Sequence, residues 1–310
     1  MISITAIGSY IPSQRESNYA KKEKFGLDDD FIVRKLGVEK VSRKATDEET
    51  SDLCVKAFAD LEARLGRRVG AVDCLVVCTQ NPDGAGIPHT SAIVHGKLGL
   101  SQHCACFDVS LGCSGYVYGL SIVKSFMRDN GLSCGLLFTA DPYSKIIDPD
   151  DKNTVLLFGD AATATLLLDD GSGSWVPGPF LFGTCGTDGG ALANRNGVLR
   201  MNGQAVFNFS AIEVPLQVHA LLKNAGVGPE DIDLFLFHQG SKYIVDTLVK
   251  RLSLPAAKVP LNLSGQGNTI SSSLPLLLQD RLDDAHLRRM LLSGFGVGLS
   301  WASCLLARME

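Results

Sequence analysis

The stretch "CFDVSLGCSGYVYGL" (residues 106–120) decides the fold. Its "FDVS" at 107–110 is typical of a buried strand, and the run "YVYGLSIVKSFM" that begins at Tyr116 is typical of a helix. Between the two lies Cys113, with Gly112 before it and Ser114–Gly115 after it. A cysteine in such a turn is either a small core residue or a nucleophile, and the turn alone favours neither interpretation.

The same alternation of strand and helix extends in both directions. Runs typical of strands occur at 72–80, 107–110 and 135–141, and again at 232–240, 259–264 and 289–298. Four landmarks repeat at nearly constant spacing: Asp73 and Asp233 differ by 160 positions, Asp108 and Asn262 by 154, Cys113 and Asn268 by 155, and Leu137 and Leu292 by 155. Four matches in order indicate a tandem duplication, with halves at 1–168 and 169–310.

This duplication predicts an α/β fold, a pseudo-twofold αβαβα five-layer sandwich. Strands that alternate with helices form mostly parallel sheets covered on both faces. The apolar helix after Cys113 is expected between the two sheets. Corresponding strand-to-helix turns then meet near the pseudo-axis, at the carboxyl ends of strands. The sequence therefore predicts that Cys113, His238 and Asn268 lie together.

Composition and charge exclude several classes of function. The 310 residues carry a formal net charge of -4, which supports neither nucleic-acid nor anionic-membrane binding. No apolar run reaches membrane-spanning length. The N-terminal "MISITAIGSYIPSQ" lacks the features of a signal peptide, so we expect a cytoplasmic protein.

The nine cysteines indicate a reduced core. Their number is odd and no Cys-x-x-Cys occurs. Cys104 and Cys106 are two positions apart, and we expect them to point to opposite faces of a strand, a poor arrangement for metal ligands. The six histidines are scattered, and none pairs with cysteine at zinc spacing. We expect no metal site.

Three polar residues remain as catalytic candidates. A helix N-terminus would lower the pKa of Cys113. His238 ends an apolar strand, where a histidine is more often structural, but it also suits proton transfer or hydrogen bonding to an oxyanion. Asn268 in "SGQGNTISSS" has an ordinary role as a turn residue, yet it takes the place equivalent to Cys113 and its amide is a neutral donor.

At this point the chain resembles the β-ketoacyl-acyl-carrier-protein synthase III family, condensing enzymes of the thiolase superfamily. The resemblance runs from "ITAIGSYIP" to "GFGVGLSWAS" and includes "FIVRKLGV", "LLFGDAA", "MNGQAVF", "HQGS" and "GQGNTISSSLP". The family's catalytic cysteine, histidine and asparagine fall on Cys113, His238 and Asn268. The "GFGVG" loop at 294–298 then brings the backbone N–H of Val297 beside that of Cys113 as an oxyanion hole.

The resemblance implies decarboxylative condensation. An acyl thioester acylates Cys113, malonyl-acyl-carrier-protein loses carbon dioxide, and the carbanion attacks the acyl-cysteine. No cofactor is implied beyond the pantetheine of acyl-CoA and carrier-protein substrates, and relatives are homodimers. The resemblance assigns substrate binding to Phe31, Lys152, Ile87, Ser241, Lys242 and Phe295.

Several of these positions depart from the family pattern. Phe31 and Lys152 stand where a tryptophan and an arginine usually hold the adenine of CoA, so the clamp is expected to be weaker. Ser241 replaces an asparagine that contacts pantetheine. Tyr243, next to Lys242, replaces a basic residue used for carrier-protein docking. At the position that closes the partner's acyl pocket, Ile87 is smaller than the usual phenylalanine, which favours a longer primer.

Three alternatives remain open. An enzyme of this type could pass its acyl group to an amine or alcohol in a specialised-metabolite or polysaccharide pathway. A catalytically silent partner subunit need not keep all three polar residues. Residue types alone also permit a hydrolase with a Cys-His-Asn triad.

Overall fold

The structure, a computed structural model, describes residues 1–309. Its strands are β1 (Ser3–Tyr10), β2 (Arg15–Ser17), β3 (Lys40–Ser42), β4 (Cys74–Cys78), β5 (Ala105–Val109), β6 (Cys134–Ala140), β7 (Ala162–Leu168), β8 (Trp175–Thr184), β9 (Leu192–Arg195), β10 (Val198–Met201), β11 (Leu234–Phe237), β12 (Arg289–Gly296) and β13 (Ser300–Arg308). Its α-helices are α1 (Lys22–Phe25), α2 (Thr50–Leu65), α3 (Thr90–Leu98), α4 (Gly115–Asn130), α5 (Lys152–Val155), α6 (Gly203–Ala225), α7 (Lys242–Arg251) and α8 (Ser273–Gln279).

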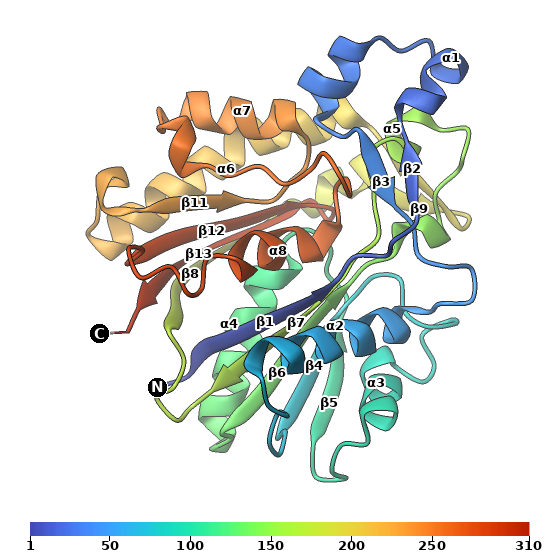
Figure 1. The fold of residues 1–310 in the computed structure, drawn as a ribbon. Helices are drawn as coiled ribbons and strands as arrows, with labels where there is room; N and C mark the ends of the chain where they lie inside the picture. The colour runs from blue at the N-terminus through green and yellow to red at the C-terminus, as the bar shows by residue number, and fades with distance from the viewer. Residues whose placement is uncertain (310) are drawn as a thin grey trace.

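Nine strands of the described chain form one mixed sheet in the order β11-β12-β13-β8-β1-β7-β6-β4-β5 (Figure 1). Outward from its centre, β1-β7-β6-β4 and β8-β13-β12-β11 repeat one pattern of two antiparallel pairs followed by a parallel pair. The two sets meet where Ile4 of β1 pairs with Trp175 of β8. One set lies before residue 169 and the other after it, where the sequence predicts the boundary between halves.

The helices cover and separate the two strand sets in layers. α2 packs on β1 and β7, and α6 packs on β8, β12 and β13. Between them, α4 contacts β4 and β6 of the first set and β8, β12 and β13 of the second, while α8 contacts β1, β7, β11 and β12. Tyr116, Val117 and Leu120 of α4 are fully buried in this central layer. The predicted five-layer sandwich is confirmed.

Matching hydrogen bonds mark the duplication. Asp73 Oδ2 accepts two backbone N–H groups at the entry to β6, 2.8 and 2.9 Å away. Asp233 Oδ2 accepts two at the entry to β12, 2.6 and 2.8 Å away. Leu137 and Leu292 likewise take equivalent places in the parallel ladders with β4 and β11. Three of the four sequence landmarks thus correspond to equivalent structural positions, counting the Cys113 and Asn268 turns that each precede a central helix.

The prediction of a strand at 259–264 is wrong. This segment is an extended loop without ladder partners in the described chain, so Asn262 is not the counterpart of Asp108 in β5. Pro260 has no N–H to donate, and the N–H of Asn262 binds Gln239 Oε1 at 2.9 Å. Leu261 is 43% exposed, so the segment also lacks a buried apolar face.

The cysteines are free thiols, and most are buried. The expectation for Cys104 and Cys106 is wrong: their sulfurs lie 3.9 Å apart, because side chains two positions apart along a strand share a face. Among residues 1–309, no group of three His, Cys, Asp or Glu side chains is placed to hold a metal ion.

Helix α6 is the one described helix long and apolar enough to suit membrane crossing. Half of its most apolar stretch is buried inside the protein, where it packs on β8, β12 and β13. Its composition is therefore explained by core packing.

Candidate active site

A cavity of about 320 Å³ opens where the turns of the two halves converge, and Cys113, His238 and Asn268 all line it. Cys113 lies between β5 and α4, His238 directly follows β11, and Asn268 precedes α8. The structure therefore brings together the three polar residues that the sequence singles out.

Cys113 is only 3% exposed, and its sulfur faces the end of β12. A Cβ atom at Gly296 would lie 2.7 Å from Cys113 Sγ, so only glycine permits this approach. Burial raises the pKa of Cys113 to about 12, and the charge of Asp141 acts in the same direction. The backbone N–H groups of Val297 and Cys113 oppose the rise but do not cancel it. The predicted lowering of this pKa is wrong, because desolvation outweighs the helix N-terminus.

His238 is buried as a neutral ring. Its backbone N–H binds Ser293 O at 2.8 Å, which fixes the end of β11 to β12. Its Nδ1 lies 2.7 Å from Ser273 Oγ, and its ring meets Phe295 edge-on at 5.5 Å. Burial lowers the pKa of His238 to about 3, so the imidazole is uncharged at neutral pH.

Asn268 faces His238 with its amide nitrogen. Nδ2 lies 3.4 Å from His238 Nε2, while Oδ1 accepts the N–H of Ile270 at 2.9 Å. The bond to Ile270 directs the carbonyl oxygen of the amide away from His238. The side chains of Asn268 and His238 therefore present two neutral nitrogens to one point of the cavity.

The mouth of the cavity is formed by aromatic and cationic side chains. Lys152 Nζ lies 5.8 Å from the centre of the Phe31 ring. Tyr243 stacks on Phe207 at 5.0 Å, and the Ser241 hydroxyl accepts the N–H of Ile244 at the start of α7. The apolar wall includes residues that the sequence did not single out: Leu157, Phe158, Leu192, Met201, Val206 and Phe207.

Two predicted substrate-binding residues do not line this cavity. Lys242 Nζ binds Asp246 at 2.5 Å and borders a neighbouring groove. Ile87 is 93% exposed on the loop before α3. Phe295, the remaining predicted residue, lies in the wall beside His238.

A buried carboxyl group beneath the site escaped the sequence analysis. Asp141 accepts the N–H of Gln80 and the hydroxyl of Ser271, each at 2.6 Å. Burial raises the pKa of Asp141 to about 6 despite these bonds. The signal was present in "GLLFTAD", where an acid directly ends a fully buried strand.

The sequence and fold are similar to those of known proteins. The profile of the family described as 3-oxoacyl-[acyl-carrier-protein (ACP)] synthase III matches residues 107–186, and that of its C-terminal part matches residues 222–308. A beta-ketoacyl-[acyl-carrier-protein] synthase III of Streptococcus equi subsp. equi is 31% identical over 97% of both chains. A crystal structure of a 3-oxoacyl-(acyl-carrier-protein) synthase III superposes with a TM-score of 0.92, at 34% identity and 99% coverage of both chains. The synthase III of Thermus thermophilus superposes with a TM-score of 0.90, at 32% identity and 98% coverage of both.

Proposed function

The chain belongs to the 3-oxoacyl-[acyl-carrier-protein] synthase III family, and we propose that it joins an acyl thioester primer to malonyl-acyl-carrier-protein with loss of carbon dioxide. The observation that carries this proposal is one cavity shared by a buried thiol, a neutral imidazole and a carboxamide. Those groups suit covalent acyl transfer followed by stabilisation of an enolate.

In the first half reaction, Cys113 attacks the carbonyl carbon of the primer thioester. The new C–S bond replaces the bond to the carrier thiol, which leaves with the proton of Cys113. The backbone N–H groups of Cys113 and Val297 already interact with Cys113 Sγ, and they stabilise the oxyanion that develops beside it. Because burial keeps the free residue a thiol, its proton must move during the attack.

In the second half reaction, malonyl-acyl-carrier-protein occupies the same cavity. Its thioester oxygen accepts hydrogen bonds from His238 Nε2 and Asn268 Nδ2 as the C–C bond to the carboxylate breaks. This role requires the tautomer in which Nε2 carries the ring proton, with Nδ1, 2.7 Å from Ser273 Oγ, accepting the hydroxyl proton. The carbanion attacks the acyl-cysteine, and a proton from solvent restores the Cys113 thiol. Neutral donors stabilise the enolate without protonating the carbanion.

The mouth of the cavity receives the carrier of the primer. Phe31 and Lys152 hold the adenine of a CoA donor, and Ser241 contacts the pantetheine arm. Lys242 and Tyr243 form part of the surface on which the carrier protein docks. The enzyme works in the cytoplasm as a homodimer, without nucleic acid, membrane, metal or further cofactor, and Ile87 of each protomer closes the partner's acyl pocket.

Intact-protein mass spectrometry tests this proposal. Wild-type protein is incubated with a panel of acyl-CoA and acyl-carrier-protein donors, beside Cys113→Ala and a control, Cys185→Ala, which removes a half-buried thiol outside the cavity. We expect one acyl mass on wild type and on Cys185→Ala, and none on Cys113→Ala. Loading of Cys113→Ala equal to wild type would overturn the covalent mechanism.

The same preparation separates the remaining alternatives. An enzyme that loads an acyl group but releases no carbon dioxide from malonyl-acyl-carrier-protein is instead a transferase to an amine or alcohol, or a hydrolase if the acyl mass is lost to water without an acceptor. A silent partner subunit neither loads nor decarboxylates. Carbon dioxide release from malonyl-acyl-carrier-protein by the acylated enzyme is therefore the second required result.

A further inference from the structure

The turn that carries Asn268 rests on the segment 155–158. The backbone N–H of Asn268 binds Leu157 O at 2.8 Å, and Asn268 O accepts the N–H of Gly159 at 2.9 Å. A Cβ atom at Gly159 would lie 1.8 Å from Gln266 O, so the two segments are in close contact. The direction of the Asn268 amide therefore depends on where this segment is held.

Side chains from a distant part of the sequence hold that segment. Arg43 Nη1 donates to Phe158 O at 2.6 Å and Arg43 Nη2 donates to Val155 O at 3.0 Å. Asn18 Nδ2 donates to Leu156 O at 2.7 Å. Together with the bond from Asn268 N–H to Leu157 O, these contacts give each backbone carbonyl group of residues 155–158 a hydrogen-bond donor.

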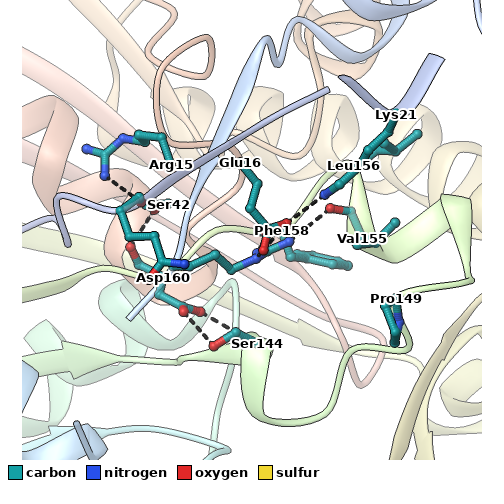
Figure 2. Close-up of polar contacts among 12 residues, drawn as sticks. Arg15, Glu16, Lys21, Ser42, Ser144, Pro149, Val155, Leu156, Phe158 and Asp160 are labelled. Atoms are coloured by element: carbon teal, nitrogen blue, oxygen red, sulfur yellow. Dashed lines mark hydrogen bonds and ion pairs between the residues drawn. The ribbon is translucent and has the colours of Figure 1, made fainter. Parts of the chain in front are cut away.

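The guanidinium of Arg43 is itself fixed inside the protein. Arg43 is 7% exposed, and its Nε lies 3.3 Å from Glu16 Oε2, which Lys21 Nζ also binds at 2.6 Å. Burial alone would raise the pKa of Glu16, but its hydrogen bond to Lys21 and the charge of Arg43 outweigh burial and lower it. Figure 2 shows Glu16, Lys21, Val155 and Phe158 gathered around this point. The planar guanidinium of Arg43, held by the carboxylate of Glu16, donates to two carbonyl groups in a fixed geometry, which the ammonium group of a lysine cannot do.

Strand β3, which ends at Ser42 next to Arg43, also binds Gln266, two residues before Asn268. Ser42 N–H binds Gln266 O at 3.0 Å, and the Ser42 hydroxyl lies 3.1 Å from the same oxygen. That hydroxyl also donates to Asp160 O at 2.6 Å (Figure 2). Ser42 therefore binds the segment that carries Asn268, and Arg43 binds the segment 155–158 on which it rests.

We propose that Arg43 is a positioning residue for the second half reaction. It touches neither substrate nor the reacting atoms. Through the carbonyl groups of Val155 and Phe158 it fixes the segment on which Asn268 rests, and so it aims the Asn268 amide at the malonyl thioester oxygen. Cys113 packs against the same apolar cluster as Leu157 and Phe158, but its position is set by the turn before α4 and the end of β12, to which Arg43 makes no hydrogen bond.

The test compares the two half reactions in Arg43→Met, Arg43→Lys and the control Arg15→Met. Arg15 lies on the neighbouring β2, but it is exposed and donates only to Gln14 O. Acylation is followed by intact mass, and decarboxylation by carbon dioxide released from malonyl-acyl-carrier-protein on pre-acylated enzyme. Since a misplacement of 1 Å can cost about 10²-fold, we expect Arg43→Met to slow decarboxylation by roughly 10- to 100-fold. Acylation should fall much less than decarboxylation, Arg43→Lys should recover part of the loss, and Arg15→Met should match wild type.

A double variant shows whether Arg43 acts through Asn268. If it does, Arg43→Met adds no further loss of decarboxylation in the Asn268→Ala background, because coupled residues are not additive. Additive losses, or equal losses in both half reactions, would overturn the proposal. Where Arg43→Met does not fold, judged by its thermal melt, Arg43→Lys replaces it in the same comparison.

This inference rests on the proposed function, but its failure has a distinct signature. If wild type neither loads an acyl group nor decarboxylates, the proposed function fails. If wild type does both, Asn268→Ala loses decarboxylation and folded Arg43 variants lose nothing, only the role of Arg43 fails.

Discussion

The turns that carry Cys113 and Asn268 occupy equivalent places in the two halves, yet they are supported differently. Cys113 leads into α4, a helix of 16 residues, and it meets the other half through its side chain, whose sulfur faces Gly296 at the end of β12. Asn268 leads through a short 3-10 turn (Ile270–Ser272) into α8, of 7 residues. Its backbone partners, Leu157 and Gly159, belong to the other half of the chain.

A duplication supplies two equivalent turns, and later substitutions can change the contacts that support each of them. Two equal turns at the centre of the molecule supply two places for functional groups. In the proposed mechanism, the nucleophile needs only a fixed relation to the neighbouring backbone N–H groups. The amide of Asn268 must be aimed at an oxygen of the second substrate, and its backbone hydrogen bonds to the other half hold it in place.

The largest expected effect tests whether the two turns serve separate half reactions. Asn268→Ala should slow decarboxylation of malonyl-acyl-carrier-protein by about 10²–10³, the usual cost of removing one oxyanion donor. Acylation of Cys113 should stay within about twofold, since Asn268 takes no part in it. Carbon dioxide release and intact mass measure the two rates. Equal losses in both would show that the turns act as one unit.

The second prediction concerns the acidity of the thiol. Because the pKa of Cys113 is about 12, its thiolate fraction rises about tenfold for each pH unit below that value. Alkylation by iodoacetamide, followed by peptide mass spectrometry, should therefore increase about 100-fold between pH 7 and 9. The Asp141→Asn variant should react faster at each pH, because it loses a charge that raises the pKa of Cys113. A plateau near pH 7 would instead support activation by the helix N-terminus.

The third prediction compares the folds of the two halves. Asp73→Ala and Asp233→Ala each remove an acceptor of two backbone hydrogen bonds at the start of equivalent strands. Each should lower the free energy of unfolding by about 1–3 kcal/mol, measured by urea denaturation. Similar losses would support equivalent roles, whereas a loss in one half alone would show that the duplicated strands contribute unequally.

The smallest effect is expected at the mouth of the cavity. Lys152→Ala removes the cation near the Phe31 ring, a contact worth about 0.5–1 kcal/mol at an exposed site. The KM for an acyl-CoA donor should rise about two- to fivefold while kcat stays the same. Steady-state kinetics on the donor that loads best provide the measurement. A fall in kcat would place Lys152 closer to the chemistry than the structure does.

Local sequence patterns were sufficient to predict most of the fold. Apolar periodicity and spacing identified the parallel strands and the central helix α4, because burial on both faces leaves continuous apolar runs. The strand at 259–264 failed because its pattern says nothing of whether Pro260 and Leu261 find partners. The positions of Cys113, His238 and Asn268 followed from the repeat, since equivalent turns must meet at the pseudo-axis.

The properties of the site depend on contacts that no local pattern contains. The pKa of Cys113 is set by how deeply the turn is buried, which follows from packing of both halves. Arg43 and Asp160 are charged residues in the interior, and their partners lie more than 100 positions away or on other segments. Only Asp141 could have been identified from the sequence, because it directly ends a run that is typical of a buried strand.

The central place of β1 has a consequence for biosynthesis. Strand β1 is made before its partner β7, which lies about 160 residues later in the chain and pairs with β1 along its length. At 5–20 residues per second, β1 waits roughly 10–30 s for that partner. During this time its apolar residues Ile4 and Ile7 are exposed to other nascent chains and to chaperones. Synonymous changes that alter translation speed between codons 10 and 168 should thus affect the yield of folded enzyme without changing one amino acid.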